Sequence, residues 1–78
     1  MADPLIQVFA ETLNLPEEKI SDATSTDNTP EWDSLAAMFL LGAFEDRFNV
    51  EFSLEEITKM RSVGIVREIL IEKKVDLS

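Results

Sequence analysis

One uninterrupted helix dominates the chain, from Ser34 to Phe48. This segment has no proline and a single glycine, and Asp33 stands directly before it as a good N-cap residue. Its apolar side chains recur at helical spacing and share one face: Ala37, Leu40, Leu41, Phe44 and Phe48. Such a face has to be buried against other elements, so the segment predicts a helical core.

Three further segments carry helix signals. Asp3 can cap a first helix, whose first position suits Pro4. The S-x-x-E pattern at Ser53 is a capping box, and Ser62 can cap a last helix that has its own apolar stripe. We expect these helices at about residues 4–14, 54–59 and 63–72, with a short further turn at residues 16–20.

A long polar loop precedes the dominant helix. Eight of the nine residues in the segment 21–29 are Ser, Thr, Asp or Asn, whose side chains compete with the backbone for hydrogen bonds and favour turns. The chain shows no pair of strands and no internal repeat. We therefore expect an all-α fold: a small four-helix bundle with three principal helices, one short helix and a long first loop, in a single domain over residues 1–78.

The residue inventory excludes most catalytic chemistry. The chain has no Cys, no His and no Tyr, which removes disulfides, thiolate and imidazole metal sites, and the Ser-His-Asp and Cys-His arrangements. We expect no catalytic residue, no resident metal and no enzymatic activity of the chain's own.

Calcium binding by the polar loop is an open alternative. Asp22, Thr24 and Thr26 imitate the alternation of an EF-hand loop, but Asp27 stands where glycine is required and Asp33 where a bidentate Glu is usual. Both departures disfavour this interpretation.

The net charge of the chain indicates which kind of partner it can bind. Sixteen acidic residues face seven basic ones, for a net charge of −9, and five of the seven bases lie in residues 59–78. Affinity for nucleic acid or for an anionic membrane is not expected, because both carry negative charge. The negative charge of the chain favours binding to proteins with basic surfaces. With no apolar run long enough to span a membrane and no basic leader, we expect a monomer in the cytoplasm.

Large apolar side chains also lie on the outward face of the dominant helix. Leu35, Phe39 and Gly42 lie opposite the core stripe, flanked by Ala36 and Ala43. Either the long loop covers them, or the helix is rotated by one residue, or they form a docking patch for partner proteins.

Ser34 at the start of this helix has two interpretations. A serine there is usually a capping residue. It cannot be an activated nucleophile, because the chain offers no base. The first turn of a helix favours an anionic modification, although Asp33 next to it opposes the added charge.

The sequence resembles the acyl and peptidyl carrier proteins over about residues 5–70. Asp33-Ser34-Leu35, which follows a long polar loop and opens a long helix, is similar to their phosphopantetheine attachment site. The resemblance extends to segments that match the end of the family's first helix, its signature, the end of its second helix and the opening of its last helix. These segments are residues 13–20, 31–35, 44–52 and 62–63.

The resemblance implies a function. A phosphopantetheinyl transferase would move 4'-phosphopantetheine from coenzyme A onto the Ser34 hydroxyl, with Asp33 helping that enzyme and its magnesium to engage the site. The thiol of the arm would hold acyl or aminoacyl groups as thioesters. Partners would be that transferase, an acyl- or aminoacyl-loading enzyme, and downstream synthase enzymes of fatty acid, polyketide or nonribosomal peptide biosynthesis.

The chain departs from fatty-acid carriers in one respect. Those carriers usually have acidic residues along the exposed face of the second helix, whereas Ala36 and Phe39 stand here and acids return only at Glu45 and Asp46. We therefore expect a carrier of a specialised pathway that docks through Leu35, Phe39, Glu45 and Asp46. The alternative is an unmodified acidic helical adaptor that docks through Leu35 and Phe39.

Overall fold

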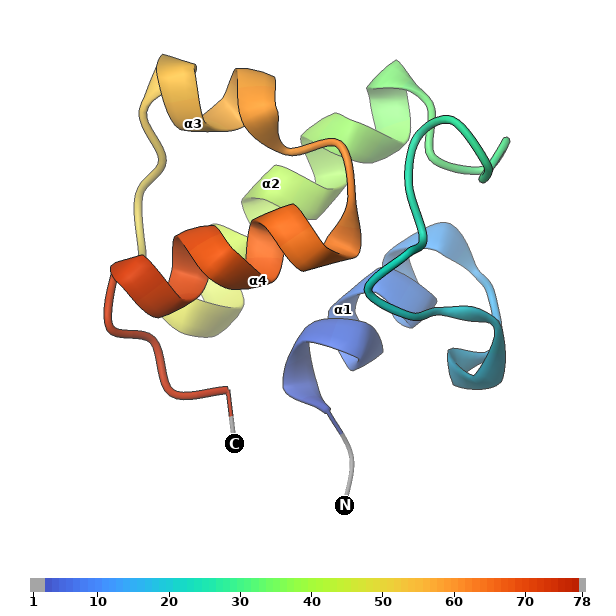
Figure 1. The fold of residues 1–78 in the computed structure, drawn as a ribbon, viewed down its shortest axis with the longest axis horizontal. Coiled ribbons are helices and arrows are strands. Elements are labelled where there is room, and N and C mark those ends of the chain that lie inside the picture. The colour runs from blue at the N-terminus through green and yellow to red at the C-terminus, as the bar shows by residue number, and fades with distance from the viewer. Residues whose placement is uncertain (1–2, 78) are drawn as a thin grey trace.

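The computed structural model describes residues 3–77, and Figure 1 shows their fold as an assembly of helices. In chain order these are α1 (Pro4–Leu13), the short 3-10 helix η1 (Glu17–Lys19), α2 (Ser34–Phe48), α3 (Leu54–Lys59) and α4 (Val63–Glu72). The all-α prediction is confirmed, and no strand occurs between residues 3 and 77. The ends of the predicted domain, residues 1, 2 and 78, lie outside the described residues.

The predicted caps set the helix boundaries. The Asp3 carboxylate accepts the amide N–H of Leu5 at 3.0 Å and opens α1. At α3 both halves of the capping box are present: Glu56 donates its amide N–H to the Ser53 hydroxyl at 3.1 Å, and the Glu56 carboxylate accepts the Ser53 amide at 2.9 Å. Helix α1 ends one residue earlier than predicted, because Asn14 adopts the left-handed conformation (φ 57°, ψ 46°) that closes a helix.

Aromatic rings from three parts of the chain form the centre of the core. The Phe9 ring of α1 meets the Trp32 ring edge-on at 5.0 Å and the Phe44 ring of α2 at 5.3 Å, measured between centroids. Seven side chains are essentially inaccessible to solvent: Leu5, Phe9, Leu40, Phe44, Val63, Val66 and Leu70. Helices α1, α2 and α4 therefore share one core, as the periodicity of their sequences indicates.

The polar loop is ordered by backbone hydrogen bonds to the connection between α3 and α4. Thr26 donates to the carbonyl of Arg61 at 2.9 Å, Val63 donates to Thr24 at 2.9 Å, and an isolated antiparallel bridge joins Ser25 to Ser62. Figure 1 shows the loop passing close to this connection before the chain enters α2. A loop without regular structure is thereby held against the connection between α3 and α4.

The orientation of α2 differs from the prediction at three alanines. Ala37 was assigned to the core stripe but is exposed, whereas Ala36 was assigned to the outward face but is half-buried against the core. Ala43 also packs against the core, and Leu41 is only half-buried. Leu40 and Phe44 set the direction of the helix because they are its two fully buried side chains, and the small alanine residues follow that direction.

None of the helices in the described part of the chain is long and apolar enough to cross a membrane.

Candidate functional site

Ser34 is the first residue of α2 and is exposed. The residue before it, Asp33, is the N-cap: its backbone is extended (φ −96°, ψ −173°), and its carboxylate accepts the amide N–H of Ala36 at 2.9 Å. The Asp33 carboxylate therefore does the capping that serines often do. Among residues 3–77, no group hydrogen-bonds to the Ser34 hydroxyl, which leaves this oxygen available for chemistry.

Trp32 fixes the position of this helix start. Its side chain is 5% exposed and packs on Phe9, and its amide N–H donates to the carbonyl of Thr29 at 2.9 Å. Only Asp33 separates this buried anchor from Ser34 and its exposed hydroxyl. The buried Trp32 side chain therefore attaches the end of the loop to the bundle.

An open depression of about 410 Å³ lies around Ser34. Its lining comes from the polar loop, the start of α2 and the connection before α4: Thr26, Trp32, Asp33, Ser34, Ala37 and Arg61. Arg61 is the single basic residue of this lining and lies 27 positions after Ser34 in the chain. The prediction from sequence missed both Arg61 and Thr26, because only the fold of the loop brings them to this place.

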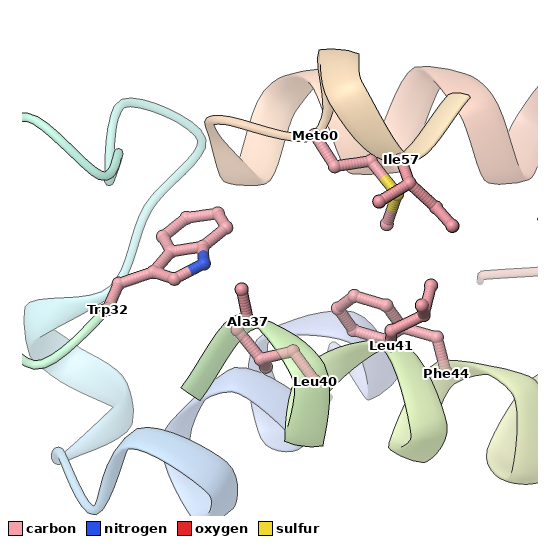
Figure 2. Close-up of a pocket in the computed structure, with 7 residues that line it drawn as sticks. All are labelled: Trp32, Ala37, Leu40, Leu41, Phe44, Ile57 and Met60. Carbon is pink, nitrogen blue, oxygen red and sulfur yellow. The ribbon is translucent and has the colours of Figure 1, made fainter. Parts of the chain in front are cut away.

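A small apolar cavity of about 40 Å³ adjoins the depression, and Trp32 and Ala37 line both. Figure 2 shows Ile57 and Met60 facing the side chains of α2 across it, with the Trp32 ring at one end. A volume of this size holds about three water molecules. In the arrangement described, α3 therefore leaves little room between itself and α2.

The outward face of α2 is apolar beside Ser34. Leu35 is 61% exposed and Phe39 is 63% exposed, so the polar loop does not cover them. Met38, which the prediction from sequence missed, is 71% exposed and belongs to the same surface. Its position three residues after Leu35 is the signal that could have revealed it. We call Leu35, Met38 and Phe39 the apolar patch.

The two acidic residues assigned to docking lie at the other end of α2. Glu45 is half-buried and Asp46 is exposed. Glu45 lies eleven positions after Ser34 on the helix, which corresponds to about 16 Å along the axis. The structure therefore brings Leu35 and Phe39 together with Ser34, but not Glu45 and Asp46.

Asp22, the first residue of the calcium alternative, is engaged elsewhere. Its carboxylate pairs with the guanidinium of Arg67 at 3.0 Å, and the Thr24 hydroxyl accepts the amide of Ser21 at 3.0 Å. Within residues 3–77, no group of three or more carboxylates is placed so that it could hold a metal ion. The loop geometry thus gives calcium binding no support.

Comparison with known proteins shows the family of the chain. The family model described as "Phosphopantetheine attachment site" matches residues 3–66. The chain is 33% identical over 64 residues to the acyl carrier protein of Buchnera aphidicola subsp. Baizongia pistaciae (strain Bp), and the match covers 82% of each sequence. The family model spans α1, the polar loop and α2, and the relative matches most of the chain, so neither match is limited to a short motif.

Proposed function

The chain belongs to the acyl carrier protein family, whose prosthetic group is phosphopantetheine, and from this premise we propose that Ser34 is the residue that carries it. The observation that carries this proposal is the exposed Ser34 hydroxyl in the sequence Asp33-Ser34-Leu35, within the matched residues 3–66. Carrier proteins of this family are generally acted on by other enzymes, and we assign Ser34 the role of an acceptor rather than of a catalyst.

The residues around Ser34 fit a phosphopantetheine arm. The hydroxyl has no capping role to lose, and it opens on a depression that an elongated group can enter. The Asp33 carboxylate holds the helix start in place, and we assign it the further role of helping the transferase and its magnesium. When attached, the arm supplies the thiol that a chain without cysteine lacks, and acyl or aminoacyl groups are held on it as thioesters.

The partners that we propose are a phosphopantetheinyl transferase, a loading enzyme and downstream synthase enzymes. Any of them has to approach Ser34, and the apolar patch of Leu35, Met38 and Phe39 begins at the next residue. Glu45 and Asp46 provide an acidic end to the same helix. We therefore propose that the loading enzyme offers an apolar recess with a basic rim, which favours a specialised pathway over the housekeeping synthesis of fatty acids.

The attachment is tested by intact mass after co-expression with a broad-specificity phosphopantetheinyl transferase. Wild type should gain the mass of one phosphopantetheine group, and Ser34→Ala should gain none. The variant should keep its fold, because the cap belongs to Asp33. Ser25→Ala, an alteration in the polar loop, is the matched control and should be modified like wild type.

The opposite results are also informative. Modification of Ser34→Ala would place the arm on another residue. An unmodified wild type, with its helical circular dichroism intact, would favour the unmodified adaptor that binds partners through Leu35 and Phe39 alone.

A further inference from the structure

Arg61 faces the same depression as Ser34. It lies in the connection between α3 and α4 and lines the depression together with Thr26 and Ser34. No other basic residue contributes to this lining. Any group attached to the Ser34 hydroxyl therefore begins in a space that is lined by one arginine residue.

Only some of the basic residues between positions 3 and 77 pair with a carboxylate. Lys59, Arg67 and Lys73 each pair with at least one carboxylate within 3.5 Å. Arg61 forms no such pair with any carboxylate in residues 3–77, although acidic residues outnumber basic ones by sixteen to seven. The Asp33 carboxylate lines the same depression but is bonded to the Ala36 amide. The five N–H donors of the guanidinium are thus available for an anion.

The backbone of Arg61 is held in place. Its carbonyl accepts the amide N–H of Thr26 at 2.9 Å, and its own amide donates to Lys59 at 2.9 Å. The next residue, Ser62, forms the bridge to Ser25. The backbone of Arg61 and the loop that leads to Ser34 are therefore parts of one hydrogen-bonded unit, which keeps Arg61 at the wall of the depression that Ser34 also lines.

We propose that Arg61 binds the phosphodiester of the arm attached at Ser34, with the Thr26 hydroxyl as a second donor. This inference rests on the proposed function. A phosphodiester carries one negative charge and two free oxygens, which a guanidinium can bind in bidentate fashion. Asp33 repels that charge, and Arg61 offsets the repulsion. The contact restricts the first part of the arm to the side of α2 that faces the α3–α4 connection.

NMR on the apo and the modified protein tests the contact directly. The Nε–Hε resonance of Arg61 should shift on modification, whereas that of Arg47, which bonds Gln7 far from the site, should stay in place. The ³¹P resonance of the modified protein should move in Arg61→Gln and remain unchanged in Arg47→Gln. Added salt should reduce the difference between wild type and Arg61→Gln, because the pair is exposed to solvent.

Intact mass measured on the same samples separates the two proposals. One outcome is that the mass shows the arm in place while the Arg61 resonance does not shift on modification and the ³¹P resonance does not move in Arg61→Gln. In that case the phosphodiester contact is overturned and the attachment at Ser34 stands. If the mass shows no arm on wild type, the attachment itself is overturned, and the contact with it. The wild-type spectra give this answer even if Arg61→Gln folds poorly.

Discussion

The guanidinium of Arg67 in α4 lies 2.7 Å from the carboxylate of Asp3, which is 64 residues earlier in the chain. The same guanidinium lies 3.0 Å from the Asp22 carboxylate of the polar loop. One side chain thus joins the cap of α1, the loop and the last helix. Burial alone would raise the pKa of Asp3, but the hydrogen bond from Arg67, the amide N–H groups of α1 and the positive charge together hold this pKa below its usual value.

Asp3→Asn tests this ion pair, because asparagine keeps the cap and removes the charge. We expect a loss of about 1 kcal/mol in the free energy of unfolding at neutral pH, since the pair is partly exposed. A carboxyl group whose pKa is lowered by folding stabilises above its unfolded pKa and loses that effect as the pH falls through the folded value. Urea unfolding from pH 7 to pH 2 should therefore show wild type and variant converging below the usual pKa of Asp, near 3.8.

The control for this measurement is Asp27→Asn, which removes a carboxylate of the exposed loop. It should leave stability within about 0.5 kcal/mol of wild type. An equal loss in both variants would mean that net charge, and not the pair with Arg67, sets the effect.

Phe39 and Phe44 should differ sharply in their contribution to stability. Phe44 is 1% exposed and packs against Phe9, whereas Phe39 is 63% exposed. Phe44→Ala should cost about 3–5 kcal/mol, while Phe39→Ala should change stability by no more than about 0.5 kcal/mol. Thermal melts of the two variants measure the difference, and a large loss in Phe39→Ala would contradict the outward position of this ring.

The apolar patch should contribute to the docking of partner enzymes. Phe39→Ala should slow the uptake of labelled phosphopantetheine from coenzyme A, catalysed by a phosphopantetheinyl transferase, by several-fold in kcat/KM, because docking surfaces concentrate their energy in few apolar anchors. Ile71→Ala is the matched control, since Ile71 is 56% exposed but lies on α4. Equal rates for all three proteins would show that this enzyme docks elsewhere.

The two glycine residues should respond in opposite directions to substitution by alanine. A Cβ at Gly42 has no neighbour within 4 Å, so Gly42→Ala should stabilise α2 by up to about 1 kcal/mol through helix propensity. A Cβ at Gly64 would lie 3.2 Å from the carbonyl oxygen of Asp22, which accepts the Gly64 amide at 3.0 Å. Gly64→Ala should weaken this contact and destabilise the protein, and chemical denaturation of both variants checks the signs. If both substitutions stabilise the protein, the backbone at Asp22 moves away from the added Cβ at little cost.

The helix boundaries were predictable because they depend on neighbours in the chain. Asp3, Asp33, Ser53 and Ser62 each accept an amide two or three residues ahead, and such local geometry follows from the sequence. The direction of α2 was less predictable. Ala36 and Ala37 are equally suited to a buried or an exposed face. The burial of Leu40 and Phe44 therefore determines that Ala36 faces the core and Ala37 faces solvent.

The motif Asp33-Ser34-Leu35 and the helix that it opens can be read from the sequence, since a cap, a hydroxyl and an apolar neighbour occupy consecutive positions. The surroundings of Ser34 cannot be predicted from the sequence. Thr26 and Arg61 reach the depression through hydrogen bonds between a polar loop and the α3–α4 connection, whose residues are more than thirty positions apart. Local signals specify a helix and its first residue, whereas the charge that faces this residue depends on how distant segments pack, because polar loops carry no periodicity that would predict their partners.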